Sequence, residues 1–152
     1  MRVAEIMTQA SLTDAPGHSL RAAAETMWRQ QTGSLVVIEA GRLVGIVTER
    51  DVLRAVATGR NVDSTTVGDV MTRDVVTTTG DASVRDAARV MAQHWIRHLP
   101  VVDGDRVVGI LSQRDIAGIF AALWNEPAGS GIDTDDLVRS RRLARIEQGD
   151  LD

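Results

Sequence analysis

Two segments of this sequence repeat one spacing of a glycine, a hydroxyl residue and an aspartate. They are Gly45–Asp51, with the sequence GIVTERD, and Gly109–Asp115, with the sequence GILSQRD. In each, an apolar run predicts a strand that ends at the hydroxyl residue, and a helix follows with the carboxylate one turn into it. Backbone N–H groups and a hydroxyl at a helix start can hold a phosphate, and the carboxylate can accept two hydrogen bonds from a ribose diol.

The same spacing also forms a capping box, in which the side chains of the first and fourth residues bind each other's backbone amides. Capping boxes are common at helix starts, so one copy alone does not distinguish a structural cap from a ligand site. The two roles are compatible, because a hydroxyl that caps an empty site can release its helix amide to a ligand. Both interpretations stay open for Thr48 with Asp51 and for Ser112 with Asp115.

The composition excludes several classes of catalyst. The chain has 152 residues and a formal net charge of −4, contains neither Cys nor Lys, and carries Arg as all 17 of its cations. Without Cys there is no thiolate nucleophile, disulfide or Cys-ligated zinc, and without Lys there is no P-loop lysine or Schiff base. No nucleophile–base pair is evident either. We therefore predict no enzymatic activity, no catalytic residue and no required cofactor.

Charge and hydropathy argue against nucleic acid and membrane as partners of this chain. The mild negative charge gives no reason to expect nucleic acid as the main partner. The first ten residues lack the apolar run of a signal peptide, and no apolar run approaches the ~20 residues of a membrane span. We expect a cytoplasmic protein without membrane contact. His94 and His98 have the spacing of a metal pair, but no third ligand is evident in the sequence, so no metal site is predicted.

The chain contains an internal duplication with a period of 64 residues. A shift by this period places Ser19–Ala24 on Ser83–Ala88 and aligns the two Gly-to-Asp segments. The alignment runs from Val3 to Leu53 without a gap, and 17 of its 51 positions are identical.

Each copy predicts the same order of elements, β-α-β-β-α. Apolar residues at positions i, i+3, i+4 and i+7 predict a helix after Ser19 and another after Ser83, both of which are good N-caps. Short apolar runs across a turn predict hairpins. The predicted strands are those around Leu12–Thr13, 35–38 and 43–47 in the first copy and 75–77, 99–102 and 107–111 in the second, and the last helices begin at Thr48 and Ser112.

The fold class that follows is mixed α+β, with two tandem repeats packed about a pseudo-twofold axis. One such unit of about 50 residues buries too little surface to be stable alone. The predicted divisions are a first repeat at 1–57, a linker at 58–66, a second repeat at 67–124 and a tail at 125–152. Acidic residues at Asp135–Asp136 followed by arginines predict a C-terminal helix in the tail. That helix is expected to pack one side on the body, or else to bind a partner or a phosphate.

In its repeated motifs the sequence resembles a known family, the CBS domain pair or Bateman module. The resemblance rests on the two Gly-x-x-Thr/Ser-x-x-Asp strings, on Asp69–Thr72 and on Ile96–Val102, in one order over residues 3 to 120. It implies a regulatory module that binds an adenosine-containing ligand, namely AMP, ADP, ATP, S-adenosylmethionine or NAD, in clefts between the repeats. It also implies a homodimer and an effector protein that senses whether ligand is bound.

The resemblance also implies roles for individual residues. Asp51 and Asp115 would bind ribose hydroxyls, and Thr48 and Ser112 would lie near the phosphate. Arg97 and His98 stand where such modules often place phosphate-binding cations, whereas the first copy has Gly33-Ser34, so the two sites are expected to be unequal. The other predicted ligand-binding residues, which would wall the adenine or flank these groups, are Thr13, Leu35, Val37, Thr77, Pro100, Val101 and Arg114.

A constitutive dimerisation scaffold is the alternative function. Its clefts would be empty, and the two aspartates would serve only as helix caps. Trp95, whichever function holds, is either a ring available for stacking or a dimer contact, and the dimer contact is the favoured interpretation.

Overall fold

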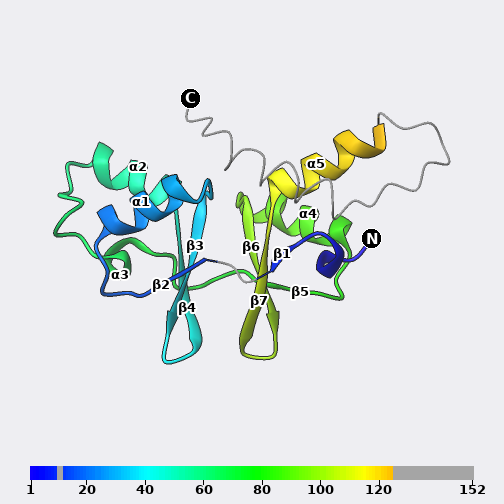
Figure 1. Ribbon diagram of the computed structural model, residues 1–152, viewed down its shortest axis with the longest axis horizontal. Coiled ribbons are helices and arrows are strands. Elements are labelled where there is room, and N and C mark those ends of the chain that lie inside the picture. The colour runs from blue at the N-terminus through cyan, green and yellow to red at the C-terminus, as the bar shows by residue number, and fades with distance from the viewer. Residues whose placement is uncertain (10–11, 125–152) are drawn as a thin grey trace. The chain divides into compact units, whose positions relative to one another are not determined.

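A computed structural model describes residues 1–9 and 12–124 (Figure 1). The expected helix at the C-terminal end of the chain lies outside these residues. The described elements are η1 (Val3–Glu5), β1 (Thr8–Gln9), β2 (Thr13–Asp14), α1 (Leu20–Arg29), β3 (Ser34–Glu39), β4 (Arg42–Thr48), α2 (Glu49–Ala57), α3 (Val67–Val70), β5 (Thr78–Thr79), α4 (Val84–His94), β6 (His98–Asp103), β7 (Arg106–Ser112) and α5 (Gln113–Trp124).

The predicted mixed α+β fold is confirmed, and its strands form two sheets. One sheet has the order β2-β3-β4, and the other has the order β1-β7-β6-β5. Strands β2 and β3 are parallel, with Thr13 opposite Val36, while β3 and β4 form the expected antiparallel hairpin. The second hairpin, β6–β7, has the same place in its repeat.

The described chain divides into two compact units that interleave along the sequence. Within the described residues, unit 1 contains Met1–Gln9, Thr77–Val101 and 109–124, and unit 2 contains 12–76 and Val102–Val108. The first residues of the first repeat therefore belong to the unit built mainly from the second repeat. Likewise, the segment that opens the second repeat, with α3, belongs to unit 2.

The core of unit 2 lies between α1 and the β3–β4 hairpin. Helix α1 begins where the sequence predicts, because the Oγ of Ser19 accepts a hydrogen bond from the Ala22 amide at 3.2 Å. Its apolar face is buried against the hairpin and α2. The fully or almost fully buried members of this cluster are Leu20, Ala23, Met27, Leu35, Val37, Val47, Ala55, Val67 and Met71.

Unit 1 repeats this arrangement with small differences. Ser83 caps α4 through a 3.0 Å hydrogen bond from the Asp86 amide to its Oγ, as expected. The short strand expected at 75–77 lies instead at Thr78–Thr79, and α5 has 12 residues where α2 has 9. Two-residue strands have too little periodicity for their ends to be fixed from sequence.

In each unit a segment from the neighbouring repeat pairs with the second strand of the hairpin. In unit 1, β1 is antiparallel to β7, with Thr8 opposite Ile110. In unit 2, Ile46 and Thr72 exchange backbone hydrogen bonds of 3.0 and 2.9 Å.

The repeated glycine of each hairpin makes room for that segment. A Cβ added to Gly109 would lie 2.7 Å from the carbonyl oxygen of Thr8, and one added to Gly45 would lie 3.1 Å from that of Thr72. In both cases the sulfur of the methionine before the threonine would be closer than 3.0 Å. Gly45 and Gly109 are thus required by the close approach of main chain.

Candidate ligand-binding site

In unit 2 the predicted Thr48 and Asp51 meet where β4 ends and α2 begins. The Thr48 amide donates to Asp51 Oδ2 at 2.9 Å, and the Thr48 hydroxyl donates to the same oxygen at 3.0 Å. Arg54 Nη2, one turn further along α2, lies 3.7 Å from Asp51 Oδ1. Asp51 is only 6% exposed, so this carboxylate is a buried group held at a helix N-terminus.

Unit 1 places Ser112 and Asp115 in the same geometry between β7 and α5. The Ser112 amide and hydroxyl donate to Asp115 Oδ2 at 2.8 and 2.7 Å, and the Asp115 amide donates back to Ser112 Oγ at 3.2 Å. Asp115 is 9% exposed. Both motifs therefore form capping boxes in this structure. Ligand binding by the same residues stays a prediction.

The residue before each hairpin also lies at the helix start. In unit 2 the Glu49 amide donates to the Gly33 carbonyl at 3.0 Å, and in unit 1 the Gln113 amide donates to the Arg97 carbonyl at 2.9 Å. Arg97 is therefore at the same helix start as Ser112 and Asp115. The main chain of an arginine thus lies at the start of α5, where the main chain of Gly33 lies at the start of α2.

Ser34 is a residue of this region whose burial the sequence did not indicate. It lies opposite Thr48 in the β3–β4 register and is 3% exposed. Among the described residues, its Oγ has no hydrogen-bond partner. A buried hydroxyl without a partner lowers stability, so Ser34 is a polar group available at the start of α2.

Four of the predicted adenine-lining or flanking residues are buried, namely Leu35, Val37, Pro100 and Val101. Leu35 and Val37 are 0% exposed and belong to the core cluster of unit 2, and Val101 is 0% exposed in β6. For Leu35 and Val37, the backbone is what remains available to a ligand. The other predicted residues are Thr13 (exposed, in β2), Thr77 (half-buried, before β5), His98 (half-buried, at the start of β6), Pro100 (buried, in β6) and Arg114 (exposed, in α5).

A third capping box provides a comparison outside the repeated motif. The Thr66 amide donates to Asp69 Oδ2 at 2.8 Å at the start of α3. This backbone hydrogen bond, with a second one from the Thr66 side chain to the carboxylate, holds the pKa of Asp69 below its ordinary value. Asp69 is exposed, whereas the two motif aspartates are buried.

The two histidines with the spacing of a metal pair lie on different elements, because helix α4 ends at His94 and strand β6 begins at His98. Within the described ranges, no three metal-binding side chains gather. Trp95 caps α4 in a left-handed conformation with φ of 55°, and it is 84% exposed. None of the helices in the described part of the chain is long and apolar enough to cross a bilayer.

Comparison with known proteins identifies both repeats. The CBS domain family model matches residues 3–58 and 67–122. The CBS domain-containing protein YhcV of Bacillus subtilis (strain 168) is 38% identical over 131 residues, which cover 86% of this chain and 91% of that protein.

Solved structures agree with this assignment. The CBS-domain containing protein ATU1752 from Agrobacterium tumefaciens has a TM-score of 0.75 at 29% identity, covering 79% of this chain and 99% of that one. The CBS domain pair of protein MJ0100, solved in complex with 5′-methylthioadenosine and S-adenosyl-L-methionine, has a TM-score of 0.76 at 31% identity, covering 81% and 98%. With two matched repeats, two strand–helix motifs and these relatives, the chain belongs to the CBS domain family and carries a pair of CBS domains.

Proposed function

We propose that this CBS domain pair is a regulatory module that binds an adenosine-containing ligand and has no catalytic activity of its own. The observation that carries the proposal is the duplicated motif of a buried aspartate and a hydroxyl residue at a helix N-terminus. Further support comes from the CBS domain pair of protein MJ0100, which binds two adenosine-containing molecules.

The geometry suggests how each group would act. In both motifs the protein's own hydrogen bonds go to Oδ2, and a carboxylate can accept about four hydrogen bonds in total. The ribose hydroxyls of a ligand would donate to the remaining acceptor positions. The helix N-terminus, with the Thr48 or Ser112 hydroxyl, would favour a negatively charged group.

The two helix starts differ in charge, so we propose that they differ in ligand preference. Arg97 lies at the start of α5 and can bind phosphate oxygens in a bidentate manner. The start of α2 has Gly33 and Ser34 in the corresponding places. A phosphate-bearing nucleotide such as AMP, ADP or ATP would thus use the α5 start. S-adenosylmethionine or another adenosine compound without phosphate would suit the α2 start.

Binding would be measured by isothermal titration calorimetry and thermal shift with AMP, ATP, S-adenosylmethionine, 5′-methylthioadenosine and NAD. A ligand at 100 times its Kd should add about 2.7 kcal/mol of stability. GMP tests recognition of the base, and 2′-deoxy-AMP tests recognition of the ribose diol. Absence of binding by every adenosine compound at millimolar concentration would reject the sensor function and favour the scaffold.

The aspartates are tested with a matched capping control. Asp51→Asn and Asp115→Asn should each weaken binding at least tenfold at one site, because an amide cannot accept the same hydrogen bonds from a diol. Asp69→Asn removes a carboxylate from a similar capping box outside the motif and should leave affinity unchanged. Equal affinity in all three variants would contradict the assignment of ribose to the motif.

We also propose that the module forms a homodimer and transmits occupancy to an effector protein. Large apolar side chains are exposed on the helices of unit 2, with Trp28 at 59%, Leu53 at 67% and Val56 at 60%. A ligand can shift the balance between states only by binding them with different affinity. Sedimentation equilibrium of the wild type and Leu53→Glu, with and without ligand, measures the homodimer and whether ligand shifts its association.

A further inference from the structure

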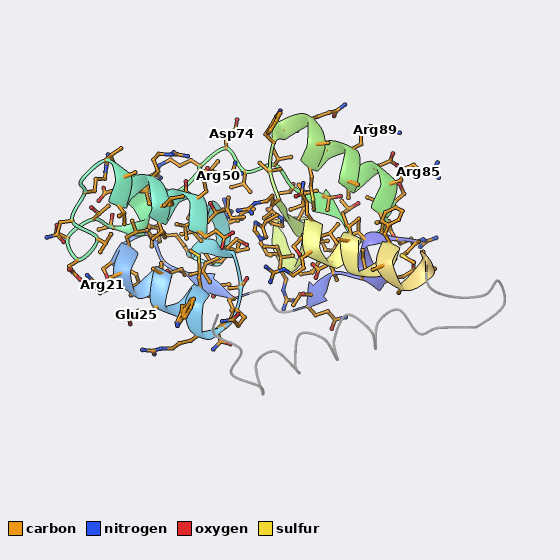
Figure 2. All side chains as sticks on the ribbon, turned by 90° about the horizontal axis from the view of Figure 1, so that it is seen from above. Arg21, Glu25, Arg50, Asp74, Arg85 and Arg89 are labelled. Atoms are coloured by element: carbon orange, nitrogen blue, oxygen red, sulfur yellow. The ribbon has the colours of Figure 1, made fainter. Side chains whose placement is uncertain are left out.

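A groove of about 660 Å³ lies on unit 1, between α4 and α5. The lining is mainly apolar, with Val84, Ile116 and Phe120 among its residues, and Arg85 and Arg89 line it from α4. Figure 2 shows Arg85 and Arg89 on α4, which lies beside α5. Phe120 and Leu123, at 61% and 58% exposure, are large apolar groups open to solvent.

The equivalent surface on unit 2 is covered by the chain that follows α2. There the Arg21 amide donates to the Val62 carbonyl at 3.0 Å, and Arg21 Nη2 donates to Asp63 Oδ2 at 3.0 Å. Val62 is half-buried and packs against the core cluster. An aliphatic residue and an aspartate therefore close the space at the N-terminal end of α1.

The duplication relates the two surfaces residue by residue. A shift of 64 places Arg21 on Arg85 and Thr65 on Met1. The Leu20 amide donates to the Thr65 carbonyl at 2.8 Å, and the Val84 amide donates to the Met1 carbonyl at 3.2 Å. Met1 therefore makes in unit 1 the backbone contact that Thr65, at the end of the covering segment, makes in unit 2. The described residues supply no counterpart of Val62 and Asp63 to unit 1.

The chain leaves α5 later than it leaves α2. In unit 2 the chain leaves α2 at Thr58, turns at Gly59 with φ of 74° and crosses to α1. Helix α5 continues through Trp124 instead, three residues beyond the equivalent of the end of α2. Because Leu123 lines the groove, the chain that continues from α5 begins at the edge of the groove.

That continuing chain contains a segment similar to the one that covers unit 2. Ile132-Asp133-Thr134 repeats the order of Val62-Asp63-Ser64, namely a branched aliphatic residue, an aspartate and a hydroxyl residue. An apolar residue follows five positions after the first in both, as Leu137 and Val67. Residues 125–131 can span up to about 23–25 Å when extended, which is longer than α4 at about 16 Å.

We propose that Ile132–Thr134 occupies the groove between α4 and α5, as Val62–Ser64 covers α1. Ile132 fills the apolar part beside Ile116 and Phe120, and Asp133 pairs with Arg85. Asp86 also lines the groove and pairs with Arg89, whose Nη1 lies 3.1 Å from its Oδ1. Charge therefore supports this occupant at Arg85, which we assign to Asp133, one of three aspartates in the sequence from 132 to 136. This pairing does not depend on the proposed ligand function.

Cysteine cross-linking tests the proposal directly, since the chain has no cysteine of its own. The full chain with Arg85→Cys and Asp133→Cys is treated with a short bismaleimide at low protein concentration. We expect an intrachain cross-link with a yield similar to that of Arg21→Cys with Asp63→Cys, a pair in contact on unit 2. Arg85→Cys with Gln148→Cys measures the yield that tethering alone produces.

Two results would overturn the proposal. One is a yield for the 85–133 pair no higher than for the 85–148 pair, and the other is cross-linking between chains, which would assign the groove to a second copy. If the Arg85→Cys variant does not fold, a second measurement that leaves Arg85 unchanged still tests the proposal. The thiol of Leu123→Cys should react with maleimide several-fold faster when Ile132→Glu is added. An unchanged reaction rate would also contradict the proposed occupant.

Discussion

The Ser112 hydroxyl and backbone amide both donate to Oδ2 of Asp115, at 2.7 and 2.8 Å. The same two donors of Thr48 reach Oδ2 of Asp51. Each motif aspartate therefore stabilises its helix before any ligand binds. A variant of either residue affects both folding and binding, and the two effects have to be measured separately.

Removal of either motif aspartate should destabilise the ligand-free protein. Asp51→Ala and Asp115→Ala each leave the amide of the preceding hydroxyl residue without its acceptor, at a cost of about 1–2 kcal/mol. The free energy of unfolding in urea, without ligand, measures this cost. Ser83→Ala removes the N-cap of α4 and should cost about 1 kcal/mol as a control. A motif variant as stable as the wild type would contradict a capping role.

The hairpin glycines should be intolerant of a methyl group. Gly109→Ala places a Cβ against the carbonyl oxygen of Thr8 and should cost about 1–3 kcal/mol. Gly45→Ala should cost less, because its shortest contact is with the flexible Met71 side chain and the nearest backbone oxygen is at 3.1 Å.

Gly118 provides the matched control for these glycines. It lies within α5, and a Cβ added there meets nothing within 4 Å. Gly118→Ala should therefore stabilise the protein by about 0.5–1 kcal/mol, since alanine is the better helix former. Thermal unfolding of the three variants should rank Gly118→Ala highest and Gly109→Ala lowest. Equal stability of Gly109→Ala and wild type would contradict the close approach of Thr8.

Stability should fall in acid through two surface aspartates of unit 2. Hydrogen bonding to Arg21 lowers the pKa of Asp63, and the Thr66 amide lowers the pKa of Asp69. A carboxyl with a lowered pKa in the folded state stabilises above its unfolded pKa of about 3.9, and this contribution is lost as the pH falls further. Urea unfolding between pH 6 and 2 should show a decline below about pH 4. The decline should be shallower in Asp63→Asn combined with Asp69→Asn, and an identical slope would exclude these groups as its source.

Ser34→Ala should raise the stability of the ligand-free protein. The Ser34 Oγ is buried without a hydrogen-bond partner among the described residues, so its removal should gain about 1 kcal/mol. If Ser34 binds a ligand at the start of α2, the same variant should lower affinity for that ligand. Unfolding and calorimetry on one preparation measure both effects. A loss of stability would mean that the hydroxyl is not an unsatisfied group.

Local patterns in the sequence were sufficient to predict the helices α1, α2, α4 and α5 and the two hairpins, but not η1 or α3. Ser19 and Ser83 cap helices as predicted, and Thr48 with Asp51 interact across only three positions in the chain. Such contacts depend on neighbouring residues and on the period of the apolar positions. The orientation of Leu35 and Val37 was harder, because β3 is apolar at consecutive positions and no alternation marks its core-facing side.

What only the tertiary structure decided is which hairpin each opening segment completes. Met7-Thr8 and Met71-Thr72 are the same dipeptide, and Gly45 and Gly109 make the same room for it. The sequence therefore indicates that such a pairing forms. It does not indicate which of the two hairpins each Met-Thr dipeptide pairs with, because both hairpins offer the same glycine. The fold pairs Thr8 with Ile110 and Thr72 with Ile46, so that each repeat's opening segment lies on the other repeat's hairpin. Backbone hydrogen bonds carry no side-chain identity, so chain connectivity and packing in three dimensions make this choice.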